Sequence, residues 1–98
     1  MTAALSDEAL DRLAAARRTA AGLEAVAELA ELLGDDQAGR WAAAGRLEHA
    51  IRRFESAAYR RISTGARPPQ GRAEELLVAI CSAPGLPRCR RRLFDLLR

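Results

Sequence analysis

Apolar residues recur every three or four positions over two long stretches of the chain, which is the spacing of one face of an α-helix. The first stretch predicts a helix that begins after Ser6, a good N-cap followed by Asp7 and Glu8, and that ends at Gly34. Its apolar stripe consists of Leu10, Leu13, Ala16, Ala20, Leu23, Val26, Ala30 and Leu33.

The second stretch predicts another long helix over residues 36–62. Its stripe consists of Trp41, Ala44, Leu47, Ile51, Phe54, Ala58 and Ile62. Because Pro68 and Pro69 cannot continue a helix, residues 63–71 are predicted to form a flexible loop.

The rest of the chain predicts two short helices. One covers about residues 72–83, and its inward-facing residues are expected to be Ala73, Leu76, Leu77, Ile80 and Cys81. After a turn at 84–87, the other begins at Pro87, which suits the first position of a helix, and runs to the C-terminus. Two long helices followed by two short ones predict an all-α, small four-helix arrangement, with a single domain over residues 1–98.

The composition limits both the core and the location. Hydrophobic residues make up 49% of the 98 residues but aromatic residues only 4%, so leucines and closely packed alanines must form the core. All 16 basic side chains are arginine, which the codon usage of a GC-rich, bacterial genome explains. Since the sequence has neither a signal-peptide pattern nor a run of about 20 apolar residues, we expect a cytoplasmic protein that does not cross a membrane.

The net charge of +3 hides an asymmetry between the two halves of the chain. Residues 1–50 hold 5 arginines against 9 acidic residues, a charge of −4, and residues 51–98 hold 11 arginines against 4, a charge of +7. The clustered arginines are Arg52, Arg53, Arg60, Arg61, Arg67, Arg72, Arg88, Arg90, Arg91 and Arg92. Three interpretations stay open: a solvated face paired with nearby glutamates, a surface for an acidic protein that includes a second copy, or a nucleic-acid surface.

The C-terminal segment combines arginines with apolar side chains. Positive side chains in the first turn of a helix oppose its dipole, but arginines and free backbone N–H groups together would bind an anion. Leu93, Phe94 and Leu97 lie close to the end of the sequence, where they either pack back on the helices or meet a partner.

No set of residues in the sequence predicts catalysis, a metal or a cofactor. His49 is the only histidine and has no companions at metal-ligand spacing. Cys81 and Cys89 flank the 84–87 turn and could form a disulfide if their Cα atoms lie within about 7 Å of each other. Cys89 also lies among arginines, an environment that makes a thiol reactive, so a redox switch is a third, weaker interpretation.

Residues 45–58 carry a local pattern of small and large side chains: Gly45, Leu47, Ala50, Ile51, Phe54, Ala57 and Ala58. This pattern resembles the second helix of a tetratricopeptide repeat, which implies a helix pair with a concave surface for a peptide or a helix. The preceding helix departs from the family at Gly34, where the family has a large aromatic residue, and no second repeat follows at the 34-residue period.

The sequence therefore predicts a non-enzymatic protein-interaction module, a small helical adaptor or chaperone-like protein that binds an acidic or helical protein and that could self-associate. The alternative is a nucleic-acid-binding accessory protein. The residues predicted to contact the partner are Arg52, Arg53, Arg60, Arg61, Arg88, Arg90, Arg91, Arg92, Leu93, Phe94 and Leu97.

Overall fold

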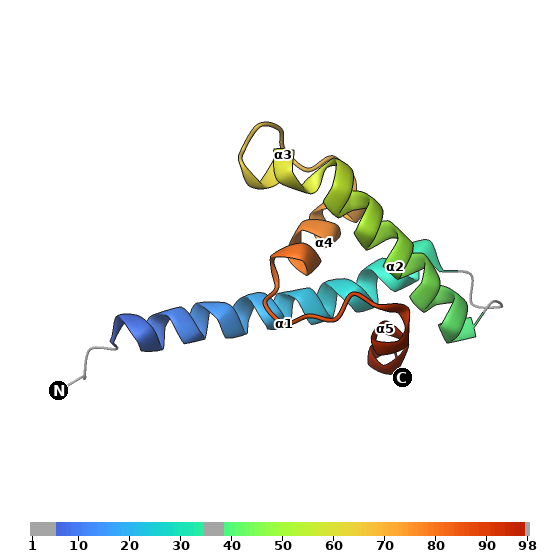
Figure 1. Ribbon diagram of the computed structural model, residues 1–98, viewed down its shortest axis with the longest axis horizontal. Helices are drawn as coiled ribbons and strands as arrows, with labels where there is room; N and C mark the ends of the chain where they lie inside the picture. Colours follow the sequence, from blue (N-terminus) through green and yellow to red (C-terminus); the bar gives the residue numbers. More distant parts are fainter. Residues whose placement is uncertain (1–5, 35–38, 98) are drawn as a thin grey trace.

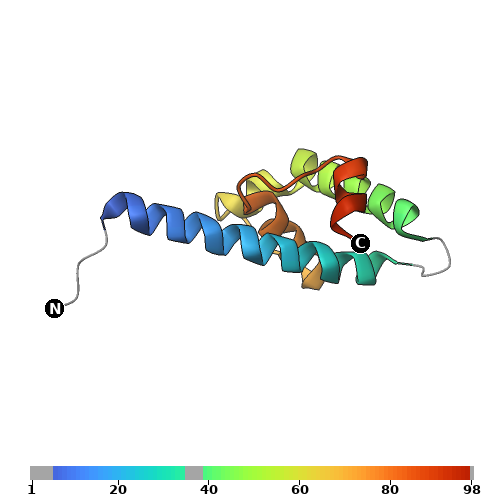
Figure 2. The ribbon, with the colours of Figure 1, turned by 90° about the horizontal axis from the view of Figure 1, so that it is seen from below.

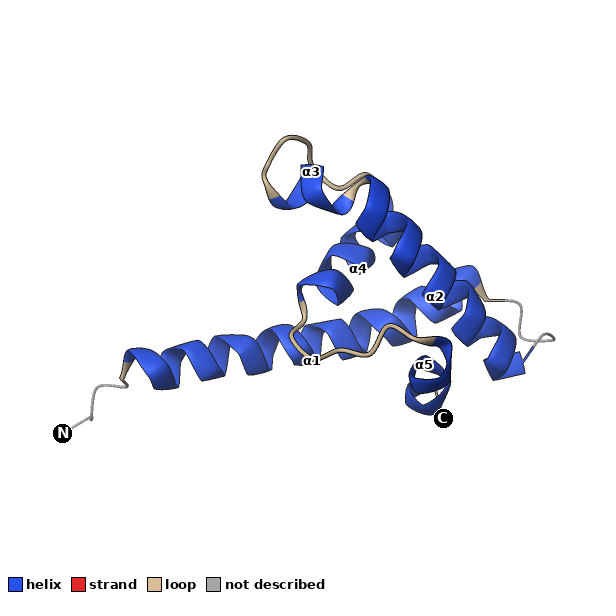
Figure 3. Ribbon diagram, viewed as in Figure 1, coloured by secondary structure: helices blue, strands red, loops and turns tan. Residues whose placement is uncertain are grey.

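A computed structural model describes residues 6–34 and 39–97. Every regular element in these two ranges is a helix, which confirms the all-α prediction (Figures 1 and 3). The helices are α1 (Asp7–Leu33), α2 (Gly39–Ala57), α3 (Tyr59–Ser63), α4 (Gly71–Ser82) and α5 (Arg90–Leu96). None of them is both long enough and apolar enough to span a membrane.

The start of α1 is capped as the sequence predicts. The Ser6 hydroxyl oxygen accepts a hydrogen bond from the backbone N–H of Ala9 at 3.1 Å, and Asp7 and Glu8 place negative charge in the first turn. Both features satisfy or complement the exposed N–H groups at the N-terminal end of a helix.

The second long helix ends earlier than predicted, because the chain turns at Ala58 and continues as the short α3. The turn brings the Tyr59 ring to 6.1 Å from the Phe54 ring, and the Tyr59 hydroxyl lies 3.2 Å from that of Ser82 in α4. The break therefore packs α3 on α2 and joins it to α4.

One hydrophobic core holds α1, α2, α4 and α5 together. The largest fully buried side chains come from all four of these helices: Leu29, Leu47, Ile51, Ile80 and Leu93. The inward-facing residues predicted for α2 and α4 are largely confirmed, but Ala73 is exposed and Trp41 is 49% exposed.

The loop between α3 and α4 is fixed at its end by one ion pair. The guanidinium of Arg67 donates to both carboxylate oxygens of Glu74, at 2.9 and 3.1 Å, and the backbone N–H of Gln70 donates to the same carboxylate at 2.8 Å. These bonds lower the pKa of Glu74 below its ordinary value.

The N-terminal half of α1 projects away from the other helices (Figures 1 and 2). No residue from Asp7 to Ala21 is buried, and the first buried position of α1 is Gly22. There the turn after α4 approaches the helix so closely that a Cβ atom on Gly22 would lie 2.5 Å from the Cβ atom of Ala83. A hydrogen bond from the Thr19 hydroxyl to the Pro84 carbonyl, at 3.1 Å, marks the edge of this contact.

The last helix begins at Arg90 rather than at the predicted Pro87. Residues 86–89 are not helical, and Leu86 is buried among the core residues. The segment before α5 thus places the Leu86 side chain in the core instead of forming the first turn of a helix.

Candidate protein-interaction site

Arg88 belongs to the internal structure of the protein. Its guanidinium donates to the Glu55 carboxylate of α2 at 2.7 Å and to the Cys81 carbonyl of α4 at 3.0 Å. The side chain therefore joins the segment before α5 to two other helices.

Arg90 fixes α5 to α2. Its backbone N–H donates to the Glu48 carboxylate at 2.7 Å, and its Nε–H donates to the Trp41 carbonyl at 2.9 Å. The anion expected near the start of this helix is thus supplied by the protein itself, through Glu48.

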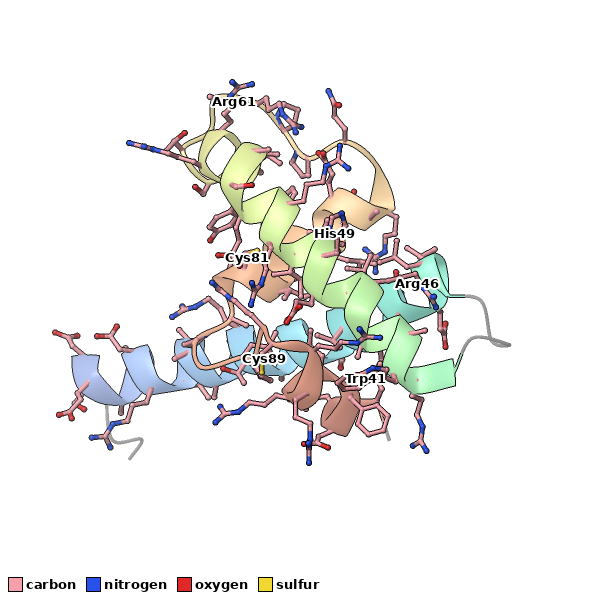
Figure 4. All side chains as sticks on the ribbon, turned by 45° about the vertical axis from the view of Figure 1, so that its right-hand side comes forward. Trp41, Arg46, His49, Arg61, Cys81 and Cys89 are labelled. Atoms are coloured by element: carbon pink, nitrogen blue, oxygen red, sulfur yellow. The ribbon has the colours of Figure 1, made fainter. Side chains whose placement is uncertain are left out.

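The other arginines predicted to contact a partner are exposed but do not form one surface. Arg52 and Arg53 lie on α2, Arg60 and Arg61 on α3, and Arg91 and Arg92 on α5. Arg52 is paired with Glu48 one turn earlier, at 3.6 Å. Figure 4 shows Arg61 at the far end of the body from Trp41 and α5, so the structure separates the α3 arginines from those of α5.

The three apolar residues predicted to meet a partner have different environments. Leu93 has no exposed area and is part of the core. Phe94 is half-buried and packs edge-to-face on Trp41, with ring centroids 5.6 Å apart and an interplanar angle of 77°. Leu97 is also half-buried and borders a groove described below.

The single apolar stripe predicted for α1 is wrong, because the helix has two apolar faces. The face on the core consists of Gly22, Ala25, Val26 and Leu29. A second series with a regular spacing of four and three residues follows another side of the helix; none of its residues is buried, and Ala30 at its C-terminal end packs against the edge of the core. We call this series the outer face, and it consists of Ala9, Leu13, Ala16, Ala20, Leu23, Ala27 and Ala30.

The outer face includes large exposed side chains. Leu13 is 43% exposed and Leu23 42% exposed, and Leu10 lies beside the face on the projecting half of the helix. The sequence feature that could have revealed the outer face is the unbroken series of spacings of four and three residues from Ala9 to Ala30. This series is separate from that of the residues of α1 that face the core.

At its C-terminal end, the outer face runs into a groove of about 430 Å³, which we call the terminal groove. Its walls come from the end of α1, the start of α2 and the end of α5. The lining residues are Ala27, Ala30, Glu31, Gly34, Gly39, Arg40, Ala43, Arg46, Leu96 and Leu97. Two residues of the outer face, Ala27 and Ala30, thus also line the groove.

Arg46 lies between the terminal groove and a second shallow groove lined by Leu33, His49 and Arg90. Its Nε and Nη2 atoms are buried and have no hydrogen-bond partner within the described part of the chain. A buried donor without an acceptor destabilises a folded protein by about 1–3 kcal/mol.

The cysteines and the histidine do not form a chemical site. Cys81 and Cys89 are both free, and Cys81 is buried, whereas Cys89 is exposed. Burial raises the pKa of the Cys81 thiol to about 11, which makes it a poor nucleophile at neutral pH. His49 is exposed, and no group of three or more metal-ligating side chains occurs within residues 6–34 and 39–97.

No protein-family model, no curated protein and no solved structure matches this chain. The resemblance of residues 45–58 to a tetratricopeptide helix therefore gains no support from a family match.

Proposed function

We propose that this chain is a non-enzymatic protein-interaction module that binds an amphipathic helix along the outer face of α1 and in the terminal groove. The observation that carries the proposal is the second apolar face of α1. When a helix has one apolar face, that face is buried in the core of its own chain. A second continuous apolar face is typical of a helix that also packs on another chain.

The terminal groove extends this surface beyond α1. Leu96 is 39% exposed and Leu97 is half-buried, so the groove offers apolar side chains as well as the polar groups of Glu31 and Arg40. An apolar centre with a polar rim is the usual composition of a protein–protein interface.

This proposal keeps the class of function predicted from the sequence and moves the contact surface. Leu97 stays in the surface, whereas Leu93, Arg88 and Arg90 hold the fold together. The nucleic-acid alternative is less well supported, because Arg88 and Arg90 make hydrogen bonds within the chain. The other arginines predicted to contact a partner are divided among three helices.

Selection of peptide ligands tests the proposal directly. A phage library of helix-forming peptides would be panned on the immobilised protein, and the enriched sequences would be measured by fluorescence polarisation. We expect peptides with apolar residues at spacings of three and four, whose affinity falls when Ala27 is replaced by Glu or Leu97 by Asp.

The matched control is Leu32→Asp, since Leu32 is the most exposed large apolar residue and lies outside both the outer face and the terminal groove. Peptide binding that survives both Ala27→Glu and Leu97→Asp would contradict the proposed surface. Binding of a labelled DNA or RNA duplex, steeply weakened by salt, in the absence of any peptide ligand would favour the nucleic-acid alternative.

A further inference from the structure

The outer face has the sequence spacing of a coiled-coil seam. Its seven residues alternate between steps of four and three, which is the a/d pattern of a heptad repeat over three heptads. From Ala9 to Ala30 the seam is about 32 Å long, at about 1.5 Å per residue. A straight seam of this length fits another straight helix better than it fits a loop or a sheet edge.

The side chains of the seam favour a close helix pair. Five of its seven positions are alanine, and the two leucines, Leu13 and Leu23, lie ten residues apart. Small residues let two helix axes approach to the lower end of the usual range of about 8–10 Å, and the leucines then fill the remaining space. Such a face is complementary to a copy of itself, because each leucine meets alanines.

Charges beside the seam select the direction of that copy. Arg17 and Glu24 lie seven residues apart on the same edge of the seam, and neither has an ion-pair partner within the described residues. In an antiparallel pair, residues on the same edge of the two helices face each other, so Arg17 of each copy meets Glu24 of the other. A parallel pair would instead place Arg12, which is already paired with Glu8 at 2.6 Å, beside Arg17 of the second copy and would leave Glu24 without a basic partner.

The antiparallel register also fills the terminal groove. When Ala20 of one copy lies level with Leu23 of the other, Leu13 of each copy lies level with Ala30 of the other, at the mouth of the groove. The projecting half of α1, which contacts little of its own chain, thereby covers the groove of the second copy. The contact between Ala20 and Leu23 and the contact between Leu13 and Ala30 each form twice, as expected for a two-fold symmetric interface.

From the spacing, the charges and the groove, we propose that two copies of this chain form a dimer through an antiparallel pair of α1 helices packed along their outer faces. The inference rests on the proposed function, because it names the helix that the interaction surface binds. In this dimer α2, α4 and α5 of each copy lie beside the helix pair, because the buried residues of α1 are offset around the helix from its outer face.

Light scattering coupled to size-exclusion chromatography tests the dimer, with protein loaded from about 1 μM to about 1 mM. We expect the mass of a dimer for the native chain. Leu13→Asp should weaken the dimer at least about 30-fold, because each substitution removes an apolar contact twice. Leu13 is exposed on the projecting half of the helix, so the variant should fold, which circular dichroism would verify. Leu32→Asp is the matched control and should leave the dimer intact.

Charge reversal tests the direction of the helices. Arg17→Glu and Glu24→Arg should each weaken the dimer, and the double variant should restore it, because the two pairs re-form with exchanged signs. As a second measurement, Ala16→Cys and Ala27→Cys would be prepared separately in a Cys89→Ser background and mixed under oxidising conditions. An antiparallel pair predicts the mixed disulfide, and a parallel pair predicts the two homodimeric ones.

A monomer over the whole concentration range would overturn the dimer, as would a dimer that Leu13→Asp leaves unchanged. A monomer that still binds the selected peptides along the outer face would leave the proposed function standing. A monomer that binds no peptide would overturn both.

Discussion

The guanidinium carbon of Arg90 lies 4.2 Å from the centre of the Trp41 ring, and the Nε–H of the same side chain donates to the Trp41 carbonyl at 2.9 Å. One arginine thus contacts both the side chain and the backbone of one tryptophan. This contact connects α5 to α2 from outside the core, and the same Trp41 ring also packs edge-to-face with Phe94 of α5.

Replacing Arg90 by Ala should lower the free energy of unfolding by about 2 kcal/mol, because the variant loses a cation–π contact and a hydrogen bond to a backbone carbonyl. The same change should shift the tryptophan emission, since Trp41 is the only tryptophan. Urea unfolding followed by circular dichroism and by fluorescence measures both effects. Arg91→Ala, a neighbouring exposed arginine, is the control and should change neither by much.

Gly45 makes room for this contact. A Cβ atom there would lie 2.8 Å from the Arg90 guanidinium carbon, so Gly45→Ala should displace the arginine from the Trp41 ring. Alanine also gains about 1 kcal/mol over glycine in a helix, so we expect a small net change in stability in the native chain. In the Arg90→Ala background the full gain should appear, and a double-mutant cycle measures the difference. Equal gains in both backgrounds would show that Gly45 and Arg90 are not coupled.

The close approach at Gly22 predicts a larger effect. Gly22→Ala should destabilise the protein by about 1–3 kcal/mol despite the better helix propensity of alanine, because the new Cβ atom would lie 2.5 Å from the Cβ atom of Ala83. Ala83→Gly removes that atom, so the double variant should recover most of the loss. Urea denaturation of the two single variants and the double variant measures the recovery, and a double variant as unstable as Gly22→Ala would contradict the steric cause.

The sequence could predict the helices and most of the core because the apolar spacings of α2 and α4 leave only one consistent face. In α1 it could not, because an alanine-rich helix allows two series of spacings and the periodicity alone does not show which one meets the core. The decision depends on where α4 and the turn after it pack, which Gly22 permits by its missing side chain. Val26 of the predicted stripe is buried, whereas Leu23, three residues earlier, is exposed.

The arginines show a second limit of sequence reasoning. Their clustering is visible in the sequence, but their acceptors are not, because Glu55 and Glu48 lie 33 and 42 residues before Arg88 and Arg90. Only the packing of α5 on α2 brings these groups together. The structure uses two of the clustered arginines to join elements of the fold, which the clustering alone does not indicate.

The buried nitrogens of Arg46 predict a stabilising substitution. Arg46→Met keeps a long, flexible side chain and removes two buried donors that have no acceptor among the described residues, so the free energy of unfolding should rise by about 1 kcal/mol. Arg53→Met, at an exposed position of the same helix, should stay within about 0.5 kcal/mol of the native value. Thermal unfolding of both variants measures the difference, and a destabilised Arg46→Met protein would show that the guanidinium has an acceptor in solution.

The thiol of Cys81 predicts a loss of stability at alkaline pH. Its pKa is raised from an ordinary 9.0 to about 11, so the folded state keeps the proton over a range in which the unfolded state releases it. The thiol's contribution to stability is therefore complete below about pH 9 and falls as the pH rises from about 9 to about 11. Urea unfolding across this range would measure the fall, and Cys81→Ala, which cannot titrate, should make it shallower. An identical pH dependence in the variant would assign the loss to other groups.

The same protonated, buried thiol should resist alkylation at pH 8 while the exposed Cys89 reacts, and mass spectrometry of the folded protein would show a single modified cysteine.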